Sequence, residues 1–252
     1  MTARLELISL DGIGEVQPED DLAALIADAA GAAGVNLTDD DCLVVTQKIV
    51  SKAEGRLVPL ADVDPSPLAL AWAERWGKDA RQVELVLRES AEIVRMAPGG
   101  LIISRTRHGL VCANAGVDVS NVGGGEVASL LPLDPDASAR GIRDGLRERA
   151  GAAPAVIISD SFGRPWRNGI VNVAVGAAGI EALRDMRGEP DAAGRVMQAT
   201  VIAVADELAS AADLAGGKVE QRPVVLVRGY AWRPSEAGAS VLVMDRERDL
   251  FP

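Results

Sequence analysis

The sequence is poor in the side chains that build several common kinds of site. It contains one histidine, His108, and two cysteines, Cys42 and Cys112, among 252 residues. These counts exclude a histidine-rich zinc site, a cysteine zinc site and a disulfide framework. A serine hydrolase would depend on His108 alone, and no G-x-S-x-G segment accompanies it. We expect both cysteines to be buried free thiols.

Aromatic residues are scarce as well, at 3% of the chain. No apolar run reaches the roughly 18 residues that a membrane-spanning helix needs, and residues 1–4 lack the apolar segment of a signal peptide. We therefore expect a cytoplasmic protein. Hydrophobic residues nevertheless make up 48% of the chain, enough for a core of Ala, Val, Leu and Ile in one large domain or two joined ones.

Positive charge is in short supply. The chain has 26 Lys and Arg against 37 Asp and Glu, which gives a formal net charge of −11. Such a surface repels nucleic-acid backbones and anionic membranes, so we expect neither as a partner. An anionic small molecule would need a local group of cations, backbone N–H groups or a metal ion.

The pattern of apolar residues predicts an α+β fold with mixed sheets and two intimately joined subdomains. Short apolar runs predict strands, and apolar residues at helical spacing predict helices. The expected strands are residues 5–10, 42–46, 92–96, 101–105, 110–113, 155–159 and 223–228. The expected helices are residues 20–33, 66–76, 80–90, 137–150 and 196–215.

Two acidic segments follow predicted strands. The strand at 155–159 is expected to end at Asp160 and Ser161, where a glycine-containing loop begins, and Asp118 lies in a polar loop after the strand at 110–113. Carboxylate and hydroxyl oxygens are ligands that Mg²⁺ prefers, usually together with substrate phosphates. Two such loops favour a shared metal site, although spacing does not establish that they meet. The alternative is that each aspartate caps a turn or helix.

A third polar segment is unusually basic for so acidic a chain. Lys48, Lys52 and Arg56 recur at helical spacing after a buried strand and are suited to binding phosphates. A solvated helix face is the competing interpretation. Two glycine-containing segments, residues 12–14 and 216–218, could bring backbone N–H groups to a nucleotide, but neither completes a phosphate-binding fingerprint.

These segments together resemble the coenzyme F420-0:L-glutamate ligase family, also called the F420 gamma-glutamyl ligases. The resemblance runs from residue 12 to residue 229. Its most specific parts are SKAEGR at 51–56, NAGVDVSN at 114–121 and SDSFGR at 159–164, with ADELA at 205–209 in support. Several matching segments in the same order are much more specific than any one of them.

The resemblance implies a reaction and a set of site residues. Such ligases use GTP to add L-glutamate to coenzyme F420-0, and then further γ-linked glutamates, through an acyl phosphate. By similarity, Asp118 and Asp160 bind Mg²⁺ or Mn²⁺, with Ser161 beside them at a second metal position, and Asp118, Asp160 and Lys52 are catalytic. The resemblance also implies that a monovalent cation such as K⁺ takes part. The implied GTP contacts are Ile13, Gly14, Glu15, Val16, Gln47, Lys48, Lys52, Asn121, Gly216, Gly217 and Lys218.

The resemblance also implies an organisation. We expect a single ligase domain over residues 1–252, without the reductase-like domain that follows it in some members. We expect a homodimer in which strands are completed between subunits. Two alternatives remain from the sequence: a related metal- and nucleotide-dependent amide ligase acting on another carboxylate, or a GTP-binding module without turnover.

Overall fold

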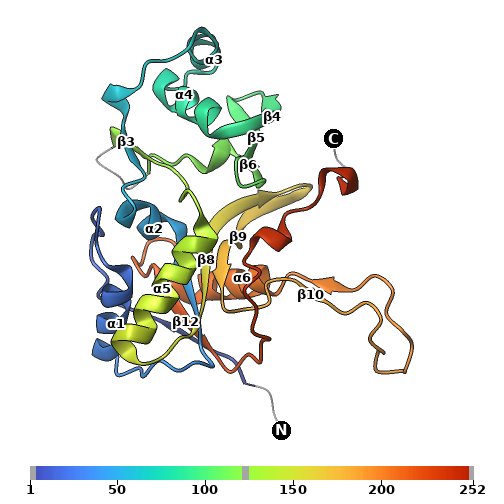
Figure 1. The fold of residues 1–252 in the computed structure, drawn as a ribbon. Coiled ribbons are helices and arrows are strands. Elements are labelled where there is room, and N and C mark those ends of the chain that lie inside the picture. The colour runs from blue at the N-terminus through green and yellow to red at the C-terminus, as the bar shows by residue number, and fades with distance from the viewer. Residues whose placement is uncertain (1–3, 121–124, 250–252) are drawn as a thin grey trace.

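The centre of the molecule is a mixed five-stranded sheet in the order β1-β12-β2-β8-β9 (Figure 1). A computed structural model describes residues 4–120 and 125–249. Only β2 and β8 run parallel; the other neighbouring strands are antiparallel. The strands are β1 (Glu6–Ser9), β2 (Cys42–Thr46), β8 (Ala155–Arg164), β9 (Arg167–Ala178) and β12 (Val224–Arg228).

Helices cover both faces of this sheet. α1 (Leu22–Ala32) and α5 (Pro135–Ala150) pack on one face, where Leu43 and Val45 of β2 point. α6 (Val204–Gly216) packs on the other, against Cys42 and Val44. The alternation of side chains along a strand thus supplies both halves of the core. α2 (Gln47–Ala53) begins directly where β2 ends.

A smaller unit lies above the sheet in Figure 1. It contains α3 (Pro67–Trp76), α4 (Ala80–Glu89) and an antiparallel sheet of β4 (Ser90–Ala97), β5 (Leu101–Thr106) and β6 (Val111–Ala113). Gly77 ends α3 in the left-handed conformation, with φ of 63°, as expected of a helix-terminating glycine. The predicted pair of helices and the three-stranded meander are confirmed.

Two short strand pairs complete the fold. β3 (Leu57–Pro59) pairs with β7 (Val127–Ser129), and β10 (Arg184–Asp185) pairs with β11 (Val201–Ile202) in an arm that extends from the sheet (Figure 1). The expected helix at 196–215 was therefore too long, because its first residues belong to this arm. Short 3-10 turns span Leu60–Asp62, Asn114–Gly116, Ser240–Leu242 and Arg246–Arg248.

The α+β class and mixed sheets are confirmed, but the end of one strand was predicted wrongly. β8 does not stop at Ser159; it continues to Arg164. The reason is antiparallel pairing with β9, which holds residues 160–164 in extended conformation after β2 has ended opposite Ser159. No glycine loop begins at Asp160.

The two cysteines and the single histidine occupy defined positions in the fold. Cys42 and Cys112 are buried and free, as expected. His108 lies in the turn after β5, where its Nε2 is 2.8 Å from the carbonyl oxygen of Pro132. None of the helices within residues 4–120 and 125–249 is both long and apolar enough to cross a membrane.

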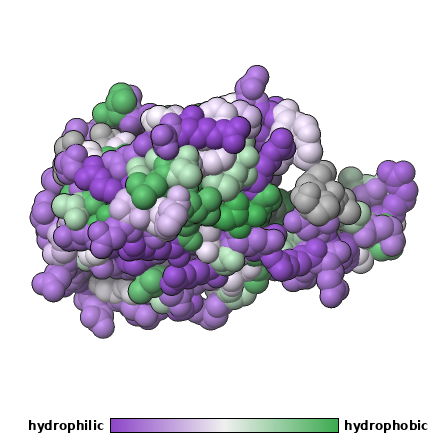
Figure 2. Space-filling view, turned by 90° about the horizontal axis from the view of Figure 1, so that it is seen from above, coloured by the Kyte–Doolittle hydropathy of each residue, from purple (hydrophilic) through white to green (hydrophobic). Residues whose placement is uncertain are grey.

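Seen from above, the surface carries apolar side chains among hydrophilic ones (Figure 2). Exposed large apolar residues of the smaller unit include Leu68 and Leu70 of α3, Ile93 and Val94 of β4, and Leu101 of β5. Strand β4 is an edge strand of its sheet, and most of its residues are exposed.

Candidate active site

A cavity of about 670 Å³ lies where β2 and β8 deliver their C-terminal residues. Its wall brings together most of the site residues predicted from the sequence: Ile13, Gly14, Glu15, Val16, Gln47, Lys48, Lys52, Asp118, Asp160, Ser161, Gly217 and Lys218. Gly216 is instead buried at the end of α6, so its backbone faces the core. Asn121 lies outside the described residues.

Asp160 is the first residue of β8 beyond its parallel pairing with β2, which ends at Ser159. The β8–β9 pairing shifts register between Ile158 and Ser159, and the N–H of Ala174, the partner of Ser159, donates to Asp206 Oδ1 at 2.8 Å. Asp160 Oδ1 accepts from the Ser161 N–H at 2.8 Å. Burial, with a smaller contribution from the charge of Asp118, raises the pKa of Asp160 to about 6.

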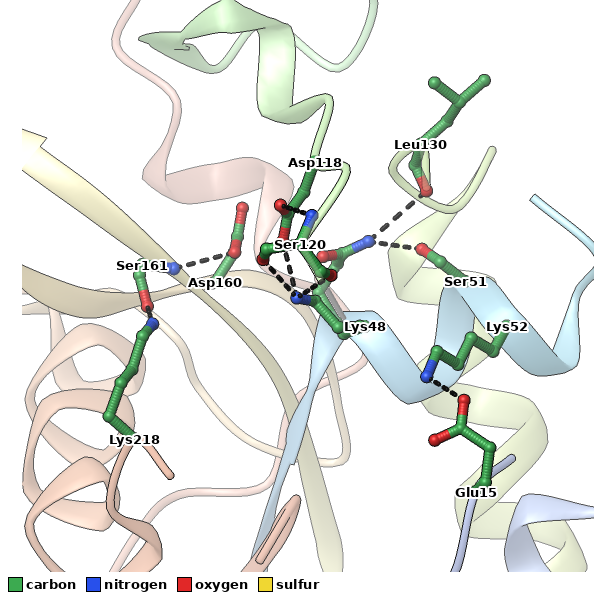
Figure 3. A network of polar contacts seen from close by, with 11 residues as sticks. Glu15, Lys48, Ser51, Lys52, Asp118, Ser120, Leu130, Asp160, Ser161 and Lys218 are labelled. Atoms are coloured by element: carbon green, nitrogen blue, oxygen red, sulfur yellow. Dashed lines mark hydrogen bonds and ion pairs between the residues drawn. The ribbon is translucent and has the colours of Figure 1, made fainter. Parts of the chain in front are cut away.

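Asp118 reaches the same cavity from a loop. Backbone hydrogen bonds in both directions with Ser129, of 3.0 and 2.7 Å, fix the main chain there. The carboxylate meets Lys48 Nζ at 2.6 Å and accepts from the N–H and Oγ of Ser120 at 2.7 and 2.9 Å (Figure 3). Burial opposes ionisation, but these hydrogen bonds and the Lys48 charge outweigh it, so the pKa of Asp118 is lowered.

The cationic wall of the cavity comes from α2, as the lysine spacing predicted. Lys52 Nζ is 2.5 Å from Glu15 Oε1, and its side chain is only 8% exposed. On the same helix, Gln47 is buried and its amide nitrogen donates to Ser51 Oγ and to the Leu130 carbonyl. Lys48 and Lys52 thus face the cavity that Asp118 and Asp160 also line.

Arg56 does not take part, although its spacing suggested phosphate binding. α2 ends at Ala53, so Arg56 leaves the helical face that carries the lysines. Its Nε donates to the Leu131 carbonyl at 2.9 Å, and its NH2 pairs with Glu89 at 2.9 Å. Arg56 therefore ties the sheet region to the smaller unit.

Sequence reasoning missed several residues of the cavity wall, among them Cys112, Asn172 and Asp213. Asn172 is 8% exposed in β9, and Asp213 projects from α6. One signal was present: Asn172 interrupts the apolar run of β9, and a buried amide in such a run needs hydrogen-bonding partners. Nothing in the sequence indicated that α6 would supply one.

The oxygen atoms at Asp118, Asp160 and Ser161 suit a hard divalent cation. Within the part of the chain that the structure describes, no three His, Cys, Asp or Glu side chains are grouped as metal ligands. Two carboxylates and a hydroxyl are nevertheless the donor set expected of Mg²⁺ or Mn²⁺ when substrate phosphates complete the coordination. The donor chemistry fits a nucleotide-bound metal and does not fit a structural zinc site.

Comparison with known proteins identifies the family. A sequence model described as F420-0:Gamma-glutamyl ligase matches residues 12–229. The coenzyme F420:L-glutamate ligase of Methanothermobacter thermautotrophicus is 48% identical over 250 residues, 98% of each chain. Its counterpart in Methanopyrus kandleri is 48% identical over 229 residues, 90% of this chain and 87% of that protein.

The same name belongs to a protein of Haloarcula marismortui that is 42% identical over 253 residues, covering 98% of this chain and 95% of that one. An alignment over 98% of this chain includes the sheet, the smaller unit and both acidic segments of the cavity. This chain belongs to the F420-0:gamma-glutamyl ligase family.

Proposed function

We propose that this protein is a GTP-dependent ligase that joins L-glutamate to coenzyme F420-0 and then adds further γ-linked glutamates. The single observation that carries the proposal is the cavity in which Asp118 and Asp160 face Lys48 and Lys52. Relatives of 42–48% identity that carry the name coenzyme F420:L-glutamate ligase support the choice of substrates.

The proposed reaction has two steps. A carboxylate oxygen of F420-0 attacks the γ-phosphorus of GTP, and the bond to the bridging oxygen breaks, so an acyl phosphate and GDP form. The amine of glutamate then attacks the acyl carbon, loses a proton, and releases inorganic phosphate as the amide forms. Both steps transfer groups between anions, so fixed positive charge is the main catalytic requirement.

The lysines of α2 meet that requirement from the protein side. The ammonium of Lys48 lies beside Asp118, and that of Lys52 lies beside Glu15, so both are held in place before nucleotide arrives. The loop that carries Ile13 to Val16 and the turn at Gly217–Lys218 line the same cavity, and the turn adds the ammonium group of Lys218. These groups would orient the phosphates without acid–base chemistry, consistent with a chain that has one histidine.

A divalent cation would be held by Asp118 and Asp160, with Ser161 beside them. Bound there, Mg²⁺ or Mn²⁺ would offset the negative charge that develops on phosphate oxygens. We propose that a monovalent cation such as K⁺ assists at the same phosphates.

A mass measurement tests the proposal. The protein is incubated with F420-0, L-glutamate, GTP and Mn²⁺, and the mass of the deazaflavin is followed with the release of GDP. We expect stepwise gains of one glutamate residue, each with one GDP. A deazaflavin of unchanged mass with intact GTP would reject the ligase. GTP consumption that adds another amine or uses another carboxylate would reject only the choice of substrate.

We also propose that the protein is a cytoplasmic homodimer. The exposed apolar side chains of the smaller unit and the open edge of β4 support such pairing. Sedimentation equilibrium tests it: twice the 26.2 kDa of one chain is expected, and a monomer at micromolar concentration would contradict it.

A further inference from the structure

A chain of hydrogen-bonded polar side chains runs from Ser161 along the wall of the cavity. Ser161 Oγ donates to Asn172 Oδ1 at 2.7 Å, and Asn172 Nδ2 donates to Asp213 Oδ1 at 3.0 Å. On the cavity side, Lys218 Nζ donates to Ser161 Oγ at 3.1 Å (Figure 3). Side chains from β8, β9, α6 and the turn after α6 therefore form one hydrogen-bonded chain that includes the Ser161 hydroxyl.

Asn172 is placed for this contact by the sheet itself. It is the direct cross-strand partner of Ser161 in the antiparallel β8–β9 pairing. Its side chain is 8% exposed in a strand that is otherwise apolar on this stretch, and an amide there is costly unless both of its ends are bonded. Both ends are bonded, one to Ser161 and the other to Asp213.

The carboxylate of Asp213 determines which way the amide faces. An ionised carboxylate only accepts hydrogen bonds, so it takes the NH₂ end of Asn172 and leaves the carbonyl end for Ser161. The Ser161 hydroxyl must then point its only hydrogen at Asn172. One of its two lone pairs accepts from Lys218, and these hydrogen bonds leave the other available on a side chain that lines the cavity.

The geometry points to Asn172 and Asp213 as positioning residues that hold the Ser161 hydroxyl as a cation acceptor. With the amide reversed, its NH₂ would donate to Ser161, and the hydroxyl hydrogen would turn toward the cavity and repel a cation. This inference rests on the proposed metal site at Asp160 and Ser161. It adds that α6, which contributes no metal ligand, sets the hydrogen-bonding state of that site.

The test measures binding of Mn²⁺ to the full chain by electron paramagnetic resonance, with GDP present and without turnover. Asn172→Ala is expected to weaken Mn²⁺ binding about tenfold, as is usual when the partner of a metal ligand is removed. Asp213→Asn, which keeps the shape of the side chain but lets the Asn172 amide reverse, is expected to weaken it several-fold. Asp160→Ala serves as the reference for loss of the site itself.

A double-mutant comparison separates positioning from general loss of structure. If Asn172 acts through Ser161, then Asn172→Ala changes Mn²⁺ affinity little once Ser161→Ala is present. Equal losses in both backgrounds would overturn the inference, because they would mean that the amide acts on the fold and not on the hydroxyl.

Ser210 provides a matched control. Its hydroxyl donates to the main-chain carbonyl of Asn172 at 2.7 Å, so it bonds the same residue without touching the amide. Ser210→Ala should leave Mn²⁺ affinity unchanged. A loss equal to that of Asn172→Ala would contradict the inference. If Asp160→Ala abolishes Mn²⁺ binding while Asn172→Ala and Asp213→Asn do not alter it, the metal site stands and the positioning role fails. Absence of Mn²⁺ binding by the unmodified protein would reject both.

Discussion

Asp118 lies in a loop and Asp160 in a strand, and both carboxyl groups face one cavity. Their pKa values are shifted in opposite directions. Asp118 is neutralised by Lys48 at 2.6 Å and by two hydrogen bonds from Ser120, and its pKa is lowered. Asp160 accepts one backbone hydrogen bond, and burial raises its pKa to about 6.

The difference shows where the protein lacks positive charge. At Asp118 a lysine of the chain already balances the carboxylate. At Asp160 burial outweighs the attraction of Lys218 and Lys48, which leaves a charge that a metal ion would stabilise. We therefore infer that Asp160 supplies most of the binding energy for a divalent cation, and that Asp118 joins it when Lys48 turns to nucleotide phosphate.

Replacing the strand carboxylate should have the largest effect. Asp160→Ala is expected to lower kcat by on the order of a hundredfold or more, because the transferring phosphate loses its main counter-charge. The assay is glutamate addition at saturating Mn²⁺ and GTP. Activity within a few-fold of the unmodified protein would remove Asp160 from the metal site.

The free energy of unfolding, measured with no metal bound, should reveal the cost of burying the ionised Asp160 carboxyl group. A carboxyl whose folded pKa rises from 3.8 to about 6 disfavours folding above that range by about 3 kcal/mol, and the penalty vanishes below about pH 4. Asp160→Asn should therefore raise the free energy of unfolding at pH 8 and leave it nearly unchanged at pH 4. Urea titrations with a chelator present measure both. A loss of stability at pH 8 would contradict the raised pKa.

Removing the lysine should move metal and nucleotide affinity in opposite directions. Lys48→Met frees Asp118 from its ion pair, so Mn²⁺ alone should bind about threefold to tenfold more tightly. GDP should bind about tenfold more weakly, a difference of roughly 1.4 kcal/mol, because a phosphate contact is lost. Calorimetric titrations with each ligand separately test this. A parallel change in both affinities would mean that Lys48 does not choose between the carboxylate and the nucleotide.

The smallest effect is expected at Glu15, whose carboxylate also lines the cavity. Glu15 is 69% exposed at its side chain, so its ion pair with Lys52 contributes below about 1 kcal/mol to stability. Glu15→Gln makes the same chemical change as Asp160→Asn but should slightly lower the free energy of unfolding at pH 8. If both variants gained stability, general relief of the net charge of −11 would explain the result better than burial of Asp160.

The sequence allowed much of this site to be predicted, and the reason is local. Asp118 and Lys48 follow strands, and Asp160 lies within one, that their own apolar runs identify, and family resemblance then joined segments far apart in the chain. The predictions that were wrong concerned residues whose conformation depends on contacts with segments distant in the sequence. β8 was predicted to stop at Ser159 because β9, the strand that extends it, could not be assigned as its partner.

For the same reason, the sequence did not predict that Asn172 and Asp213 line the cavity. Nor did it predict that the pKa values of Asp118 and Asp160 shift in opposite directions. Each is set by atoms brought together from β8, β9, α2 and α6, and only Asn172, which interrupts an apolar run, has a signal in its own segment. At Arg56 a local signal was misleading. Its helical spacing indicated phosphate binding, but α2 ends before it and its guanidinium group forms an ion pair with Glu89.

Anomalous diffraction from crystals grown with Mn²⁺ and GDP tests the central claim most directly. We predict a manganese peak within coordination distance of a carboxylate oxygen of Asp118 and one of Asp160, with Lys48 displaced from Asp118. A peak that contacts neither aspartate, with Lys48 still paired to Asp118, would contradict the account.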